Sequence, residues 1–224
     1  MNTNNKKINL HKNQNQMARK YFLTVGALIS WFAIIAQFYL LIENRITSIP
    51  ETTIRFFSYF TILTNILVAL YFTTNLLNKN SKIKLFFQKP GILTAIAVYI
   101  AIVGLIYQIV LRHLWEPKGF QMIVDELLHT LIPIEFIIYW LLFEDKKILR
   151  WRDILYWLIY PLLYIIYILI RGSFSDFYPY PFINVTELGY KKVAINLFGL
   201  LLLFSIFSVF FIGIAKLLAK KASR

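Results

Sequence analysis

The sequence predicts an all-α polytopic membrane protein: one bundle of six transmembrane helices with both termini cytoplasmic. Composition gives the first reason, because 58% of the 224 residues are hydrophobic and 17% aromatic, with a mean hydropathy of +0.61. A soluble domain of this length uses far less apolar sequence. Segment length gives the second reason, because a helix needs about 20 apolar residues to cross a bilayer core. Six segments come close to that length: 21–42, 56–77, 91–111, 122–143, 154–171 and 193–219.

The distribution of charge between the loops gives the third reason. Most of the 24 basic residues lie in the two termini and in the connections around 78–89 and 144–153. Loops rich in Lys and Arg stay in the cytoplasm, so both termini are predicted to lie on the cytoplasmic side of the cell (cytoplasmic) membrane. We interpret the net charge of +13 as topology and contact with anionic headgroups, not as nucleic-acid binding. Membrane lipids are therefore the expected partners.

The chain divides into three regions. Residues 1–20 are rich in Asn, Gln and Lys and are predicted to be a disordered cytoplasmic tail. Residues 21–219 form the transmembrane domain, and 220–224 a short basic cytoplasmic tail. The first apolar run is longer than a signal-peptide core and lacks a small-residue cleavage site, so we expect it to be retained. The chain has no cysteine, which excludes disulfides, thiolate metal sites and a cysteine nucleophile.

The first predicted helix, 21–42, is apolar apart from Thr24, Ser30 and Gln37 and offers no obvious chemistry. A short polar connection containing Pro50 follows it.

The second predicted helix, 56–77, carries a polar stripe of Ser58, Thr61, Thr64 and Asn65 on one face. Small hydroxyls and amides often serve helix packing within membranes. The depth of Thr61 favours a second interpretation, because at 1.5 Å per residue it lies roughly 7–8 Å below the start of this helix.

The fourth predicted helix, 122–143, carries Asp125, Glu126 and His129 in its first turns. An ionisable group near the centre of a bilayer costs roughly 2.5–3.5 kcal/mol on insertion scales, so such groups face protein or water. The spacings i,i+4 and i,i+3 allow either carboxylate to reach the imidazole. His129 lies roughly 10 Å below the start of its helix, at the level of Thr61.

The other helices supply further polar groups at the same level. The third, 91–111, ends in Tyr107 and Gln108. The fifth, 154–171, has one face of tyrosines that leads to Arg171, and such a face can pack, lie at the interface or cradle a carboxylate or headgroup. This face comprises Tyr160, Tyr164, Tyr167 and Arg171.

The longest predicted outer loop contains Tyr178-Pro179-Tyr180-Pro181-Phe182. Each proline fixes its own φ and restricts its predecessor, so this run is stiff and can cap a cavity or lie flat in the interface. The sixth helix, 193–219, carries Asn196 about one turn in.

Together these residues suggest an acyl-transfer site in an outward-facing vestibule suited to an amphiphile with an acyl tail. Thr61 is the candidate nucleophile and His129 the candidate base. Asp125 or Glu126 would orient the imidazole, and Asn65 would donate to the oxyanion. Tyr164, Arg171 and Asn196 would support the site or bind substrate.

Three stretches carry a family resemblance: FFSYFTILTNILVALYF, DELLHTLIPIEFIIYWLLF and LIRGSFSDFYPYPFINV. On the basis of these stretches, the chain resembles the bacterial Pr-six-Pr family of six-span membrane proteins. The resemblance covers nearly the whole chain except the tails. That family is distantly similar to the androgen-induced and androgen-dependent intramembrane hydrolases, which cleave fatty acid esters of hydroxy fatty acids with a threonine and a histidine. The resemblance places these residues at Thr61 and His129, with Thr64 as the competing threonine.

Three alternatives stay open on the sequence. A metallohydrolase would draw its ligands from His113, His129, Asp125 and Glu126. A small-molecule or proton-coupled transporter, or a lipid-binding protein without catalysis, would use the same polar groups without a covalent step. In a purely structural interpretation, Asp125 and Glu126 lie at the level of the lipid headgroups and His129 is a hydrogen-bonded packing residue. The hydrolase interpretation, which we favour, requires no cofactor and no metal.

Overall fold

The computed structural model describes residues 3–77, 81–114 and 116–221, and this part of the chain is helical without strands. The α-helices are α1 (Thr3–Glu43), α2 (Ile49–Phe56), α3 (Phe60–Leu76), α4 (Lys82–Phe87), α5 (Ile92–Ile106), α6 (Phe120–Glu126), α7 (Ile132–Phe143), α8 (Asp153–Trp157), α9 (Ile159–Ser175) and α10 (Val185–Lys221). Two π-helical turns, η1 (Tyr107–Leu111) and η2 (Leu127–Leu131), continue α5 and α6. Two 3₁₀ turns are η3 (Lys146–Ile148) and η4 (Pro181–Ile183).

The predicted all-α class is confirmed, and the helices indicate an integral membrane protein. Within the described residues, five helical segments are long and apolar enough to span a membrane. They are Asn13–Glu43, Ile92–Leu111, Phe120–Phe143, Asp153–Ser175 and Val185–Lys221. A sixth candidate arises only if α2 and α3, which meet at a bend of 69°, count together as one span.

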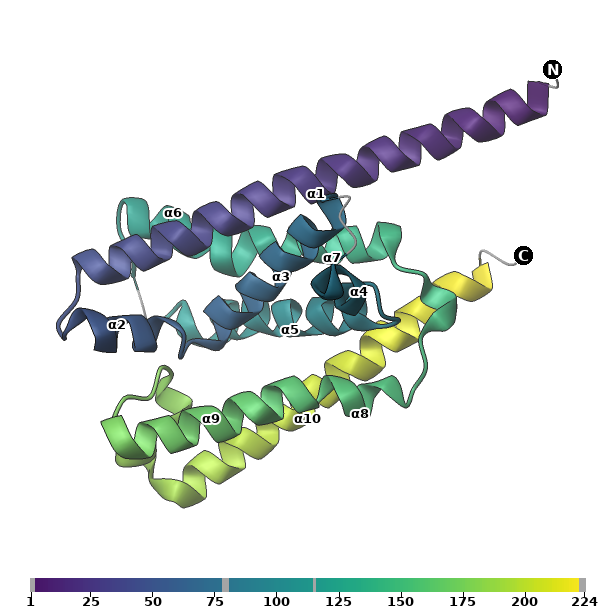
Figure 1. The fold of residues 1–224 in the computed structure, drawn as a ribbon. Helices are drawn as coiled ribbons and strands as arrows, with labels where there is room; N and C mark the ends of the chain where they lie inside the picture. The colour runs from purple at the N-terminus through teal and green to yellow at the C-terminus, as the bar shows by residue number, and fades with distance from the viewer. Residues whose placement is uncertain (1–2, 78–80, 115, 222–224) are drawn as a thin grey trace.

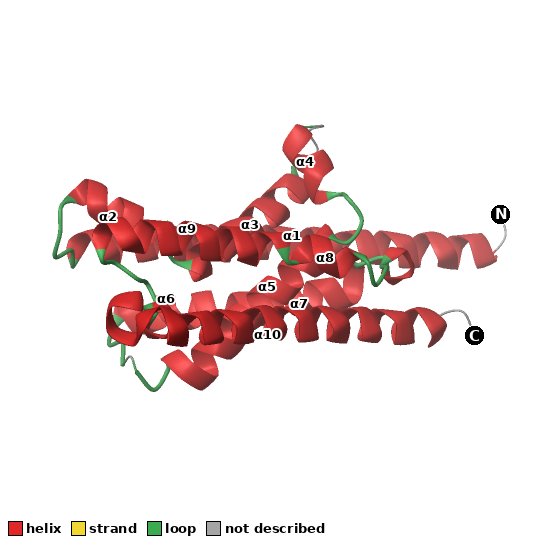
Figure 2. Ribbon diagram, turned by 90° about the horizontal axis from the view of Figure 1, so that it is seen from below, coloured by secondary structure: helices red, strands yellow, loops and turns green. Residues whose placement is uncertain are grey.

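The main helices run along one long axis (Figures 1 and 2). Both ends of the chain emerge at the same end of the molecule, and α2 lies at the opposite end, here called the α2 end. Helix α1 packs on α3 and α7, while α5 packs between α3, α7 and α10. Helix α9 packs with α8 and α10.

The centre of the bundle is an aromatic cluster of Phe72, Phe136 and Tyr139, each with no exposed surface. The ring of Phe72 lies 5.2 Å from that of Phe136 and 5.4 Å from that of Tyr139, with edge-to-face geometry. Helix α1 approaches this cluster closely because residue 26 is glycine. A Cβ atom at Gly26 would lie 2.4 Å from the Phe72 ring.

Several boundaries differ from the sequence prediction. Helix α1 begins at Thr3, within the tail that the sequence predicts to be disordered. The tail contains no proline or glycine, and adding turns to an existing helix needs no new nucleation. The helix α10 extends to Lys221 with a break in its backbone dihedrals at Gly189. Of the predicted basic tail 220–224, residues 222–224 lie outside the described residues.

The second predicted helix is also shorter than expected. Helix α3 begins at Phe60, because the chain breaks between α2 and α3. Tyr164 donates to the Ser58 carbonyl at this break (2.9 Å), and the Ser58 hydroxyl donates to the Ile54 carbonyl (2.7 Å). Thr61 therefore lies in the first turn of α3 and not deep along a longer helix.

Candidate functional site

A cavity of about 1080 Å³ lies at the α2 end of the bundle. Its walls come from α1, the α2–α3 bend, η1, the connection between η1 and α6, α6, η2 and the proline-rich segment before α10. It brings together Thr61, Tyr107, Asp125, His129 and Tyr180, which the sequence places on four separate segments. Of the residues predicted for the site, Thr61, Asp125 and His129 line this cavity.

His129 is held by its own helix in a defined tautomer. Its Nδ1 atom lies 2.9 Å from the Asp125 carbonyl oxygen and 3.6 Å from Asp125 Oδ1. Because a carbonyl only accepts, Nδ1 carries the proton of the neutral ring, and Nε2 keeps its lone pair. Within residues 3–77, 81–114 and 116–221, no hydrogen bond to Nε2 is present. Nε2 of His129 is therefore the nitrogen that can accept a proton as a general base.

Tyr107 contacts both Asp125 and His129. Its hydroxyl donates to Asp125 Oδ2 at 2.7 Å, and its ring stacks on the His129 ring with centroids 4.1 Å apart and planes at 12°. Tyr107 and His129 stand on the two π-helical turns, one from each helix. In η1 the Arg112 amide donates to the Tyr107 carbonyl five residues back (2.8 Å), the π-helical pattern that recurs at functional sites.

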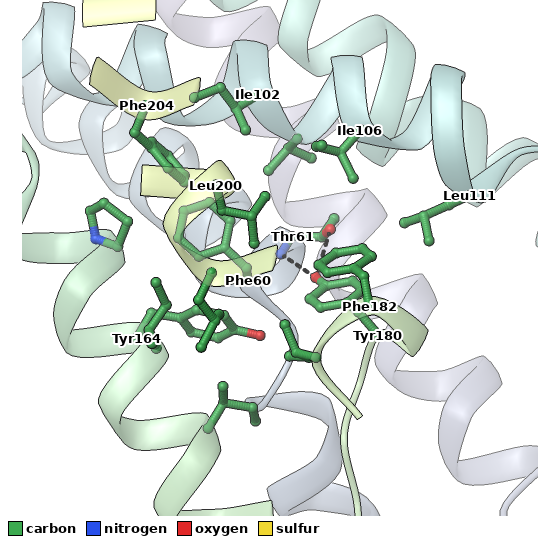
Figure 3. Close-up of a pocket in the computed structure, with 16 residues that line it drawn as sticks. Phe60, Thr61, Ile102, Ile106, Leu111, Tyr164, Tyr180, Phe182, Leu200 and Phe204 are labelled. Carbon is green, nitrogen blue, oxygen red and sulfur yellow. Dashed lines mark hydrogen bonds between the residues drawn. The ribbon is translucent and has the colours of Figure 1, made fainter. Parts of the chain in front are cut away.

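Thr61 stands at the amino-terminal end of α3. An amide in the first turn of a helix has no partner within that helix. The Thr61 amide instead donates to the Tyr180 hydroxyl at 3.2 Å, and Thr61 Oγ1 lies 3.3 Å from the same hydroxyl. Figure 3 shows these two contacts, with Phe182 stacked against Tyr180.

Asn65 connects the two halves of the site. Its amide nitrogen donates to the Thr61 carbonyl (2.9 Å) and to the Leu128 carbonyl (3.2 Å), so α3 lies beside η2 as the site hypothesis requires. Both amide hydrogens are therefore used by backbone carbonyls. Asn65 is completely buried and holds the backbone in place, and it does not point a donor into the cavity in the way predicted for an oxyanion donor.

Glu126 and Thr64 face away from the cavity. Glu126 pairs with Arg112 and accepts a hydrogen bond from Thr130 at 2.7 Å, so it does not reach the imidazole. Thr64 Oγ1 lies 3.3 Å from the Tyr160 hydroxyl, deeper along α3. Neither residue lines the cavity.

The three predicted supporting residues fasten the α2 end of the structure. Arg171 donates to Glu51 (2.7 Å) and Ser175 (2.8 Å), outside the cavity walls. Asn196 donates to the Phe182 carbonyl at 2.8 Å and so ties the proline-rich segment to α10. Tyr164 holds the α2–α3 break and lines an adjoining apolar slot.

This apolar slot, of about 60 Å³, lies between α3, α5, α9 and α10 (Figure 3). Its walls are almost entirely hydrocarbon, including Ile102, Ile106, Leu200 and Phe204. Thr61, Leu111 and Tyr180 line both the slot and the large cavity, so these residues form the seam between them.

Across the described residues, no group of three His, Asp or Glu side chains is arranged to hold a metal ion. Comparison with family models, with curated proteins and with solved structures finds no match for this chain. The function of this chain is therefore inferred from the geometry of its site.

Sequence reasoning did not assign roles to Tyr107 and Tyr180. Tyr107 was recognisable as part of a polar turn at the level of His129, but its stacking depends on two π-helical turns that no spacing rule predicts. The stiffness of the Tyr178-to-Phe182 run was recognisable, but not that Tyr180 reaches back across 119 residues to Thr61.

Proposed function

We propose that this chain is an integral membrane hydrolase of lipid esters, with Thr61 as nucleophile and His129 as base. One observation carries the proposal: a single cavity holds Thr61 and the Tyr107–Asp125–His129 group, and Thr61 stands where this cavity meets an apolar slot. A nucleophile, a base and an orienting group around one space are the parts that acyl transfer requires.

The lining of the two spaces favours an amphiphilic substrate. The large cavity exposes the polar side chains of Gln37, Asn44 and Glu116 together with apolar groups. The slot offers hydrocarbon side chains. A lipid ester bound across the seam would place its polar part in the cavity, the start of its acyl chain in the slot and its carbonyl carbon at Thr61.

The reaction then follows in two halves. Thr61 Oγ1 attacks the ester carbonyl carbon, its proton passes to His129 Nε2, and the carbonyl electron pair forms an oxyanion. Collapse expels the alcohol, which takes the proton from His129 and leaves an acyl-threonine. Water, deprotonated by His129, attacks the acyl carbon in the second half, and Thr61 leaves with the proton restored.

The charge distribution supplies an orientation for this chemistry. With the basic connections in the cytoplasm, both termini lie on the cytoplasmic side of a bacterial cytoplasmic membrane. The cavity at the α2 end then opens toward the exterior. The substrate would therefore come from the outer leaflet or from the exterior.

The test compares ester hydrolysis by purified wild type, Thr61→Ala, His129→Ala and Thr64→Ala in detergent. Thr64→Ala is the matched control, because Thr64 also contacts a tyrosine hydroxyl at 3.3 Å but lies outside both spaces. Hydrolysis lost in the first two variants and kept in the third supports the proposal. A folded wild type that hydrolyses no ester would instead favour a carrier or a lipid-binding protein.

A further inference from the structure

We propose that Tyr180 is the hydrogen-bond donor that stabilises the oxyanion formed at Thr61. This inference rests on the proposed hydrolase function. It gives Tyr180 the role for which Asn65 is unsuited, since both amide hydrogens of Asn65 are held by backbone carbonyls.

The position of the phenol is the first support. The Tyr180 hydroxyl lies 3.3 Å from Thr61 Oγ1 and accepts the Thr61 amide at 3.2 Å. Once Oγ1 has attacked, it and the oxyanion are bonded to the same carbon, so a donor beside Oγ1 is also beside the oxyanion. Because the phenol oxygen already accepts the amide, its own hydrogen is the one that remains to donate.

The rigidity of the phenol is the second support. Tyr180 is 8% exposed, and its ring packs edge-to-face with Tyr59 at 5.9 Å and parallel to Phe182 at 5.3 Å. Asn196 holds the Phe182 carbonyl, and Pro179 and Pro181 restrict the backbone on either side. Donors fixed before the reaction cost no reorganisation when charge develops.

Burial also keeps this phenol protonated. It raises the pKa of Tyr180 to about 12, so the hydroxyl keeps its hydrogen throughout the neutral range. The first turn of α3 separately favours an oxyanion at Thr61, because the amino-terminal end of a helix carries partial positive charge.

In the balanced step, Thr61 Oγ1 bonds to the acyl carbon and its proton moves to His129 Nε2. The former carbonyl oxygen takes the π electron pair and accepts a hydrogen bond from the Tyr180 hydroxyl. Collapse returns that pair to the carbonyl and breaks the bond to the alcohol oxygen, which leaves with the proton from His129. Tyr180 ends as it began, without net proton transfer.

The test is Tyr180→Phe with Tyr160→Phe as matched control, assayed with nitrophenyl octanoate in detergent micelles. The Tyr160 hydroxyl contacts Thr64 at the same 3.3 Å distance, so it controls for the loss of a phenol hydroxyl that contacts a threonine of α3. We expect kcat to fall about 100- to 1000-fold in Tyr180→Phe at an unchanged KM, as on removal of one oxyanion donor. Tyr160→Phe should keep its kcat.

The outcomes separate the two proposals. An inactive wild type contradicts the hydrolase function itself. An active wild type with Tyr180→Phe equally active overturns the role of Tyr180 and leaves the function standing. Where Tyr180→Phe fails to fold, fluorotyrosine at position 180 decides: its more acidic phenol should lower the pH at which kcat is lost on the alkaline side. An unmoved alkaline limb overturns the inference.

Discussion

At the residue scale, Tyr107 controls His129 through two contacts at once. Its ring stacks on the imidazole, and its hydroxyl holds the carboxylate of Asp125, which lies beside Nδ1. The carbonyl of Asp125 binds the same nitrogen. These contacts fix the orientation of the imidazole and leave Nε2 without a protein partner among the described residues. The aspartate of a serine triad orients its histidine in the same way.

Tyr107→Phe separates these two contacts, because it keeps the ring and removes the hydroxyl. A hydrogen bond to a charged group contributes about 1.5–3 kcal/mol, so we expect roughly a tenfold to hundredfold loss of kcat for ester hydrolysis. Tyr99→Phe is the control on the same helix, since the Tyr99 hydroxyl donates to the Trp157 carbonyl outside the cavity. Equal kcat values for the two variants would contradict the role of Tyr107.

The two carboxylates of the fourth predicted helix can be distinguished in the same assay. Asp125→Asn should lower kcat, because it replaces the charge beside Nδ1 of His129. Glu126→Gln should leave kcat within about twofold of wild type, since its partners are Arg112 and Thr130. A larger loss in Glu126→Gln than in Asp125→Asn would contradict this placement.

At the element scale, the site depends on interruptions in otherwise regular helices. The 69° bend between α2 and α3 exposes the first turn of α3 at the cavity, and the two π-helical turns aim Tyr107 and His129 at each other. Periodicity in the sequence predicts regular helices, so it located the segments but not these interruptions. The pairing of Tyr107 with His129 therefore required the structure.

The close approach of α1 to α3 is tested by Gly26→Ala. The added methyl group would lie 2.4 Å from the Phe72 ring, and overpacking of a core costs about 1–3 kcal/mol. We expect a lower melting temperature in detergent. Gly213→Ala is the control, because a Cβ atom there meets no atom within 4 Å and alanine favours helix. A Gly26→Ala variant as stable as Gly213→Ala would contradict the packing.

The carboxyl-terminal end of α7 gives a pH-dependent prediction. Burial raises the pKa of Glu144 above its ordinary 4.5, although the Thr94 hydroxyl donates to it at 2.8 Å and Lys146 lies nearby. The folded state thus favours the protonated acid: its stabilising effect is full below pH 4.5 and is lost as the pH rises through the raised pKa.

Glu144→Gln removes this ionisation and keeps an acceptor for Thr94. The melting temperature of wild type should therefore fall relative to Glu144→Gln as the pH is raised from 4.5 toward neutrality. Parallel melting curves for the two proteins across that range would contradict the burial of an ionisable Glu144.

At the scale of the whole molecule, composition and segment length were sufficient to predict an all-helical chain of apolar spans. The sequence also predicts Thr61 and His129 at one level, and both line the same cavity, but Thr61 lies there in the first turn of α3 and not at depth along a longer helix. The partners of the other polar residues could not be derived this way. Asn65, Glu126 and Arg171 each point to a neighbour that only the packing of the bundle determines.

The most direct measurement is covalent labelling of the purified protein with a fluorophosphonate probe, followed by mass spectrometry to locate the modified side chain. An activated nucleophile at the seam of the two spaces predicts an adduct on Thr61 that is abolished in His129→Ala and retained in Thr64→Ala. A well-folded wild type that takes no label, or one labelled at Thr64, would contradict a threonine hydrolase centred on Thr61.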